Sequence, residues 1–278
     1  MSAFVTRFAP SPTGHLHLGH AHSALFAARQ AGTGGRFLLR IEDIDPLRCR
    51  PAFIAAIAED LAWLGLTWPQ PVRRQSDHLA DYAAALKRLE GLGLLYPCFC
   101  TRADIAREIE QSGHAPHGPD GPLYPGLCRA LPAAEAAARQ AAGQPCALRL
   151  HMAKALALAG PLRWHDLDQG WQTAQPDLFG DIVLARKDVP ASYHLAVTVD
   201  DALQGITLVT RGQDLFEASH VHRLLQALLN LPVPQWRHHS LLRDEHGKRY
   251  AKRDNALTLR SFREAGKTPA EVRALAGF

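Results

Sequence analysis

Two histidines at the start of a predicted helix are the first candidates for chemistry in this sequence. His17 and His20 lie three residues apart, so they share one face of the first helical turn. A helix N-terminus attracts phosphate through its N–H groups and its dipole, and Gly19 would let a nucleotide approach the backbone closely. Imidazoles placed there could donate hydrogen bonds to a phosphate in a transition state. The alternative is a Gly- and Pro-rich turn with surface histidines, which would be the preferred interpretation of a lone histidine.

A group of acids follows the second predicted strand. The string Arg40–Asp45 holds Glu42, Asp43 and Asp45 directly after the apolar run 37–41. Ligands of open α/β sheets bind outside the carboxyl ends of the strands, where a carboxylate could bind an ammonium group. On residue types alone, a solvated acidic loop is the alternative.

Three of the five cysteines could form a metal site. Cys98, Cys100 and Cys128 would supply three thiolates for a tetrahedral zinc ion. Buried free thiols explain the same residues equally well, and the spacing alone does not decide between the two. An odd number of cysteines in a reducing compartment argues against a disulfide framework.

The composition is that of an ordinary globular protein. The 278 residues are 47 % hydrophobic and 21 % charged, which suits one large domain or a core with an insertion. No apolar run reaches the ~18 residues that span a bilayer, and Met1–Thr6 lacks the basic start of a secretory signal. We therefore expect a cytoplasmic protein without membrane contact. The formal net charge of +4 is compatible with a polyanionic partner but does not require one.

The elements that would position these residues follow an alternating pattern. Strands are predicted over 4–9 and 37–41, and apolar residues at helical spacing predict helices over 18–28, 53–64 and 79–89. This order predicts a doubly wound parallel α/β sheet of Rossmann type.

The stretch that follows changes character and contains a Gly/Pro-rich loop and an alanine-rich helix over 133–142. We interpret it as an α+β insertion between the two halves of the sheet domain, because strand-like segments return over 181–185 and 206–210 and a helix over 217–229. Capping boxes are expected at Thr101 and Thr268. The expected divisions are 1–96 and 181–240 for the two halves, 97–180 for the insertion, and 241–278 for a loop and short helical tail.

The segment Arg7–His20 resembles the HIGH signature region of class I aminoacyl-tRNA synthetases. His17-Leu18-Gly19-His20 stands at the signature, after the Arg-Phe-Ala-Pro-Ser-Pro-Thr-Gly string of glutamyl-type members. Arg40–Asp45 is similar to the glutamyl string Arg-Ile-Glu-Asp-Thr-Asp. Gly247–Asp254 resembles the KMSKS signature: Lys252 matches its second lysine, whereas Arg249 replaces the first lysine and Ala251 the serine. The resemblance extends from Arg7 to about Asp254.

The resemblance implies a site for glutamate and for ATP with Mg²⁺. Glu42 would hold the α-amino group of the substrate, and Arg7 and Arg211 could pair with its carboxylates through the planar fork of arginine. Tyr193 would by itself be a core or rim aromatic, but the family pattern places it beside the glutamate. The implied glutamate-binding residues are Arg7, Ala9, Ser11, Glu42, Tyr193 and Arg211. The implied ATP-binding residues are His17, Gly19, His20 and Lys252, of which His17, His20 and Lys252 would be catalytic.

Short glutamyl-type synthetases also resemble this chain in their cysteines, with a Tyr-x-x-x-Cys pair that Tyr124 and Cys128 match. The resemblance implies a structural Zn²⁺ held by Cys98, Cys100, Tyr124 and Cys128. His114 or His117 remains open as an alternative fourth ligand.

The chain ends at Phe278, soon after Lys252, so we expect no anticodon-binding domain. The family that combines a glutamyl-type core with this length is that of the glutamyl-queuosine tRNA(Asp) synthetases. Membership would imply a monomer that activates L-glutamate with ATP and transfers it to queuosine in the anticodon loop of tRNA(Asp).

Three other functions are weighed against this one. A minimal glutamyl-tRNA synthetase that charges a 3′ end is disfavoured by the chain length. A non-catalytic tRNA-binding paralogue is disfavoured by the intact His17, His20, Glu42, Arg211 and Lys252. A small-acid adenylate-forming ligase of the same superfamily would not explain the glutamyl-type string.

Overall fold

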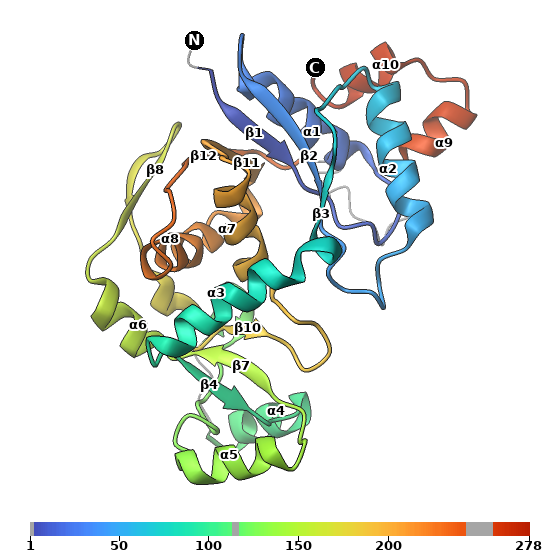
Figure 1. Ribbon diagram of the computed structural model, residues 1–278. Helices are drawn as coiled ribbons and strands as arrows, with labels where there is room; N and C mark the ends of the chain where they lie inside the picture. Colours follow the sequence, from blue (N-terminus) through green and yellow to red (C-terminus); the bar gives the residue numbers. More distant parts are fainter. Residues whose placement is uncertain (1–2, 113–116, 243–257) are drawn as a thin grey trace.

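The computed structural model describes residues 3–112, 117–242 and 258–278. Its centre is an α/β unit with parallel strands (Figure 1). The first group of strands pairs in parallel in the order β1 (Val5–Phe8), β2 (Arg36–Ile41) and β3 (Arg73–Arg74).

A second group of strands comes from later in the chain. β11 (Leu208–Gly212), β12 (Gln235–His239) and β8 (Arg163–Asp166) pair in parallel, in that order. β9 (Gly170–Thr173) pairs antiparallel with β8 at the edge.

The two groups lie side by side because β1 contacts β11. The N–H of Thr207 donates to the carbonyl of Val5 at 3.0 Å, and the side chain of Arg7 donates to the carbonyl of Thr210 at 3.0 Å. These contacts advance in the same direction along both strands, so the carboxyl ends of β1, β2, β11 and β12 meet at one edge. The predicted parallel α/β sheet is confirmed.

Helices cover the strands and bury two main apolar cores. The first core lies between the strands β1 and β2 and a set of helices at both ends of the chain: α1 (Leu18–Ala31), α2 (Pro51–Trp63), α9 (Leu259–Glu264) and α10 (Pro269–Leu275). The second core joins α3 (Leu79–Gly91), α6 (Met152–Ala159), α7 (Tyr193–Leu203) and α8 (Ala218–Leu228). Residues at helical spacing make these contacts, as predicted for α1 by Leu18, Ala21 and Leu25.

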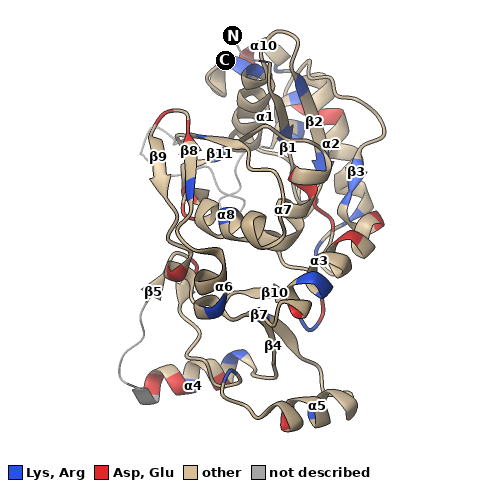
Figure 2. Ribbon diagram, turned by 60° about the vertical axis from the view of Figure 1, so that its left-hand side comes forward, with Lys and Arg blue, Asp and Glu red and all other residues tan. Residues whose placement is uncertain are grey.

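The insertion forms a separate small sheet at the end of the molecule remote from α10 (Figures 1 and 2). Its order is β10-β7-β4, all antiparallel, with β4 (Leu95–Cys98), β7 (Ala147–Leu150) and β10 (Val183–Ala185). Two helices and a short hairpin complete it: α4 (Arg102–Ser112), α5 (Ala133–Ala141), β5 (His117–Gly118) and β6 (Gly121–Pro122). Both basic and acidic residues lie along α4 and α5 (Figure 2), so neither helix carries charges of one sign only.

Two details of the chain path differ from the sequence interpretation. The strand expected over 181–185 exists as β10, but it pairs antiparallel with β7 in the small sheet and not with the parallel strands. Conversely, β8 lies within the range 97–180, yet its Asp166 pairs in parallel with Trp236 of β12. The chain therefore returns to the main sheet before β10.

Local signals at helix starts agree with the structure. Thr101 and Asp104 exchange backbone and side-chain hydrogen bonds of 2.7 to 3.1 Å before α4, and Thr268 and Glu271 form a reciprocal capping box at α10. Proline follows Thr268 at the first helical position, as expected. Within the described ranges, no helix combines the length and apolarity needed to cross a bilayer.

Candidate functional site

A cavity of about 550 Å³ opens at the carboxyl ends of the parallel strands. It is formed by the end of β1, the start of α1, the residue after β2, the start of α7 and the end of β11. The predicted substrate residues that line it are Arg7, Ala9, Ser11, His17, Gly19, His20, Glu42, Tyr193 and Arg211. Lys252 and the rest of the KMSKS-like segment lie outside the described residues.

The two histidines of the HIGH-like segment cap the N-terminus of α1. His17 is the N-cap residue, and its Nδ1 accepts the N–H of Gly19 at 3.1 Å. The Nδ1 of His20 accepts the N–H of His17 at 3.2 Å, which completes a capping box. Because each Nδ1 accepts a hydrogen bond, a neutral ring carries its proton on Nε2, which can donate to a ligand. The helix start thus combines dipole, N–H groups and imidazole donors beside the cavity.

One wall of the cavity is a network of buried charges. Asp201 accepts hydrogen bonds from Arg7 Nε at 2.9 Å and Arg7 Nη2 at 3.2 Å, and from Arg40 Nη1 at 2.8 Å. Arg40 also reaches Glu42 at 3.3 Å and Asp200 at 3.6 Å. Burial raises the pKa of Glu42 although Arg40 and Arg7 oppose the shift. Burial also favours a high pKa for Asp201, but Arg7 and Arg40 together hold it below its usual value.

The opposite wall centres on Arg211, whose partners are all neutral groups. Its Nη2 donates to Ser219 Oγ at 2.6 Å and its Nε donates to His238 Nε2 at 3.2 Å. Its Nη1 lies 3.2 Å from His222 Nδ1 and 3.4 Å from the hydroxyl of Tyr193. In the described part of the chain, no carboxylate lies within ion-pair distance of this guanidinium. Burial accordingly lowers the pKa of Arg211, against a smaller opposing effect of Tyr193.

The histidines on this wall are held neutral. Burial and the neighbouring Arg211 lower the pKa of His238 to about 4, despite Asp166 at 2.7 Å. Burial first, and Arg211 second, also place the pKa of His222 well below its ordinary value. At neutral pH both rings therefore act as hydrogen-bond acceptors for Arg211 and add no positive charge.

Sequence reasoning missed several residues that shape the site. Asp201 had a signal, since Asp200 and Asp201 are adjacent acids that follow the mostly apolar run 195–199 in one helix. Ser219, His222 and His238 had no local signal, because they reach Arg211 only through tertiary contact.

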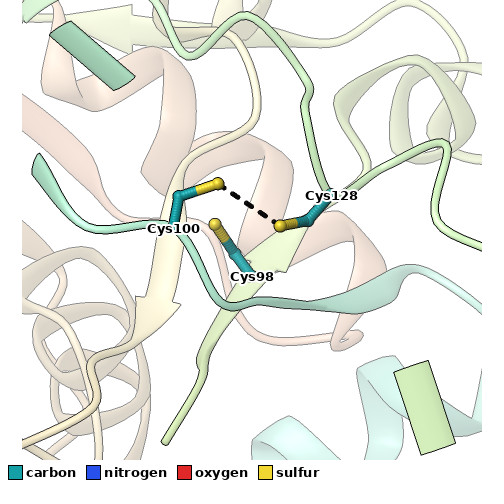
Figure 3. Close-up of side chains that lie close together, drawn as sticks. All are labelled: Cys98, Cys100 and Cys128. Carbon is teal, nitrogen blue, oxygen red and sulfur yellow. Dashed lines mark hydrogen bonds between the residues drawn. The ribbon is translucent and has the colours of Figure 1, made fainter. Parts of the chain in front are cut away.

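The predicted cysteine cluster is assembled in the insertion. The sulfurs of Cys98, Cys100 and Cys128 all lie within 4.8 Å of one another and point toward a common centre (Figure 3). The Tyr124 hydroxyl lies 3.4 Å from the Cys98 sulfur and 3.5 Å from that of Cys100. The sulfurs of Cys100 and Cys128 lie 3.3 Å apart, well beyond the ~2.05 Å of a disulfide, and all three cysteines are free thiols.

The donor set fits a tetrahedral metal. Sulfur ligands at ~2.3 Å from zinc would stand roughly 3.8 Å apart, so the cluster needs only small shifts to close around an ion. His117, one alternative fourth ligand, is not a member of the described cluster. His114, the other alternative, lies outside the described residues.

Comparison with known proteins gives one consistent result. Residues 3–275 match the family described as tRNA synthetases class I (E and Q), catalytic domain. The chain is 51 % identical to a Glutamyl-Q tRNA(Asp) synthetase of Rhodobacter capsulatus, over 98 % of this chain and 99 % of the relative. It is 45 % identical to the Nocardia farcinica protein of the same name, over 97 % of this chain and 82 % of the relative.

A solved structure agrees with these relatives. A glutamate tRNA ligase from Elizabethkingia meningosepticum, in complex with its amino acid, superposes with a TM-score of 0.81 at 28 % identity. The match covers 99 % of this chain but only 60 % of that ligase. The family match over residues 3–275 includes the residues that form the cavity, with Arg7 on one wall and Arg211 on the other. The chain therefore belongs to the class I tRNA synthetases of the E and Q type, alongside the glutamyl-Q tRNA(Asp) synthetases.

Proposed function

We propose that this protein activates L-glutamate with ATP and transfers it to queuosine in tRNA(Asp). The observation that carries the proposal is the single cavity in which Arg7, Glu42 and Arg211 face a helix N-terminus capped by His17 and His20. Two cations and one anion match an amino acid that has two carboxylates and one ammonium group. The N-terminus of α1 supplies the adjoining phosphate site.

The charges of the walls suggest how glutamate would sit. Arg211 has no anionic partner among the described residues, so it is the group that gains most from an incoming carboxylate, which we assign to the substrate side chain. Glu42 would receive the α-ammonium group, and this new positive charge would lower the pKa that burial now raises. Arg7 and Ser11 would then face the α-carboxylate.

Activation joins that α-carboxylate to the α-phosphorus of ATP and releases pyrophosphate. The N–H groups of α1 and the Nε2 donors of His17 and His20 would stabilise charge that develops on the phosphate. Lys252 is proposed to bind the departing phosphates, and Mg²⁺ would enter with ATP and neutralise their charge.

The acceptor proposal rests on the relatives. The Rhodobacter capsulatus relative is a Glutamyl-Q tRNA(Asp) synthetase that the chain matches over almost its entire length. The ring diol of queuosine can present two adjacent hydroxyls to the activated carbonyl, as a terminal ribose does, so the same chemistry can act on a loop nucleotide. An exposed loop nucleotide is the usual target of sequence-specific RNA recognition.

The cysteine cluster is proposed to hold a structural Zn²⁺. Cys98, Cys100, Cys128 and Tyr124 would fill all four positions, which leaves no open position for catalysis. The ion would tie β4 to the loop that carries Tyr124 and Cys128. Metal analysis of untagged, gently purified protein should give about one zinc per chain, and metal-free protein would favour free thiols.

Two assays test the proposed reaction. Glutamate-dependent exchange of pyrophosphate into ATP should occur without tRNA, and alanine at both His17 and Lys252 should abolish it. Labelled glutamate should then enter tRNA from cells that make queuosine but not from cells that cannot. Equal labelling of both pools, with the label on the 3′ adenosine, would instead establish a minimal glutamyl-tRNA synthetase.

A further inference from the structure

His238 gives Arg211 an acceptor whose orientation depends on a third residue. Arg211 Nε lies 3.2 Å from His238 Nε2, and the other ring nitrogen, Nδ1, lies 2.7 Å from Asp166 Oδ2. The side chains of Asp166 and His238 are both fully buried. The chain of contacts runs from β8 through β12 to β11 and ends in the cavity.

The hydrogen-bond roles in this chain are fixed by chemistry. A carboxylate only accepts hydrogen bonds, so His238 must carry its proton on Nδ1. Its Nε2 is then bare and accepts from the guanidinium, which can only donate. The hydroxyl of Ser219 fits the same scheme, because it accepts from Arg211 at 2.6 Å and lies 3.5 Å from His238 Nε2.

Arg211 has a second imidazole acceptor, but that one is anchored less firmly. His222 Nδ1 lies 3.2 Å from Arg211, and His222 Nε2 lies 3.2 Å from His194 Nδ1. His194 in turn faces Asp120 at 3.5 Å, and that carboxylate is 73 % exposed. A solvated carboxylate at this distance constrains the rings much less than a buried one at 2.7 Å.

We propose that Asp166 and His238 are positioning residues that fix the guanidinium of Arg211 in the orientation that receives the side-chain carboxylate of the amino acid substrate. Asp166 does so at a distance, by selecting the histidine tautomer whose Nε2 accepts from Arg211. The inference rests on the proposed function for the role of Arg211. It predicts that substrate affinity depends on a carboxylate that does not line the cavity.

Asp166→Asn tests this directly, since it replaces one acceptor oxygen by a donor NH₂ and changes almost no volume. Asp166 Oδ1 accepts the N–H groups of Asp168 and Gln169, both at 2.9 Å. These two donors would keep the amide oxygen of asparagine in place and turn its NH₂ toward His238. His238 would then move its proton to Nε2, where it opposes the Nε–H of Arg211.

The expected result is a selective loss. In the pyrophosphate exchange assay, Asp166→Asn should raise KM for glutamate roughly tenfold or more, with KM for ATP within about twofold. The matched control is Asp168→Asn, the same substitution two residues away in an exposed pair with Arg237, which should change neither constant. Equal changes in both KM values of Asp166→Asn, or none, would overturn the proposal.

A second variant separates positioning from a loss of folding. His238→Gln places an amide at the position of Nε2, and glutamine can turn its oxygen toward Arg211 whatever stands at position 166. The double variant Asp166→Asn, His238→Gln should therefore regain most of the glutamate affinity that Asp166→Asn loses. A double variant no better than Asp166→Asn alone would mean that Asp166 acts only through stability.

Nuclear magnetic resonance reads the tautomer without any assay of activity. Long-range ¹H–¹⁵N spectra of protein labelled in its histidines should show His238 protonated at Nδ1 in the wild type and at Nε2 in Asp166→Asn, with His238→Gln identifying the signals. An unchanged tautomer would overturn the proposal. Absence of glutamate-dependent exchange in the wild type would count against the proposed function. The spectra would still show whether Asp166 sets the tautomer of His238.

Discussion

The two walls of the cavity hold their arginines in opposite ways. On the β1 side, Arg7 forms a two-pronged ion pair with Asp201, and Arg40 donates to the same carboxylate. On the β11 side, Arg211 is equally buried, but its hydrogen-bond acceptors are Ser219, His222, His238 and Tyr193, all of them neutral. The charge of Arg7 is balanced before a ligand arrives, whereas that of Arg211 is balanced only when a carboxylate binds.

This difference indicates how the two arginines divide their roles. A buried cation without an anion is expensive to fold, and the lowered pKa of Arg211 reflects that expense. Such a group gains strongly from a carboxylate in a desolvated cavity. Arg7 keeps N–H groups that can face the cavity, but its charge is already balanced, so its main contribution there is geometric.

Replacing Arg211 should give the largest effect on activity. Arg211→Met removes the charge and keeps most of the volume. We expect kcat/KM for glutamate to fall roughly 30- to several-thousand-fold, which corresponds to a loss of ~2–5 kcal/mol of binding free energy in the transition state. Because no carboxylate of the described residues is left unpaired, the melting temperature should fall less than in the corresponding Arg7 variant. Exchange kinetics and thermal denaturation without glutamate measure both quantities.

Arg211→Lys serves as the control for charge against geometry. It keeps a cation but loses the planar fork, so its activity should lie between the wild type and Arg211→Met. A loss of activity below about tenfold in Arg211→Met would refute the assignment of the substrate carboxylate to this wall.

Replacing Arg7 should damage stability as well as activity. Arg7→Met leaves Asp201 buried with Arg40 as its remaining partner within 3.0 Å, and breaking a buried pair costs up to about 3–5 kcal/mol. Activity with glutamate should fall at least ~30-fold if Arg7 also contacts the substrate. A variant with full stability and less than about tenfold loss of activity would show that Arg7 contributes neither to stability nor to substrate binding.

The sequence predicted the start of α1 better than the contacts within either wall, for physical reasons. The HIGH-like segment and the capping boxes are local, so residue types and spacing suffice to find them. The pair Arg7–Asp201 joins residues 194 positions apart, and His238–Asp166 joins residues 72 apart, so only the folded sheet brings them together. The pairing of β10 was missed because three apolar residues look the same in a parallel and an antiparallel strand.

The comparison extends to buried carboxylates. Asp201 has two arginine partners and a lowered pKa, so the stability it contributes is present above the unfolded pKa of ~3.9 and is lost as the pH falls below it. The side chain of Asp60 in α2 is fully buried, has no hydrogen-bond partner among the described residues and lies 3.7 Å from Arg263. Burial raises its pKa to about 6, although Arg263 opposes the shift.

Asp60→Asn should therefore stabilise the protein in a pH-dependent way. Because the pKa of Asp60 is raised in the folded protein, its contribution to stability is fully present below pH ~3.9 and is lost as the pH rises through about 6. Relative to the wild type, Asp60→Asn should gain up to about 3 kcal/mol at pH 8 and little at pH 4. Urea denaturation at both pH values measures the difference, and an equal effect at both would show that Asp60 does not titrate in this range.

Tyr193→Phe should give the smallest effect and also tests the Arg211 wall. The hydroxyl of Tyr193 lies 3.4 Å from Arg211 Nη1, longer than the 2.6 Å contact with Ser219 and the 3.2 Å contacts with His222 and His238. Removing a long hydrogen bond to the hydroxyl of a residue that is 39 % exposed should cost about 0.5–1.5 kcal/mol, or roughly 2- to 10-fold in KM for glutamate. The orientation of Arg211 would persist, because its three shorter contacts, with Ser219, His222 and His238, still hold the guanidinium. A loss as large as that of Arg211→Met would mean that the tyrosine hydroxyl itself binds the substrate carboxylate, and the wall would then depend on Tyr193 as much as on Arg211.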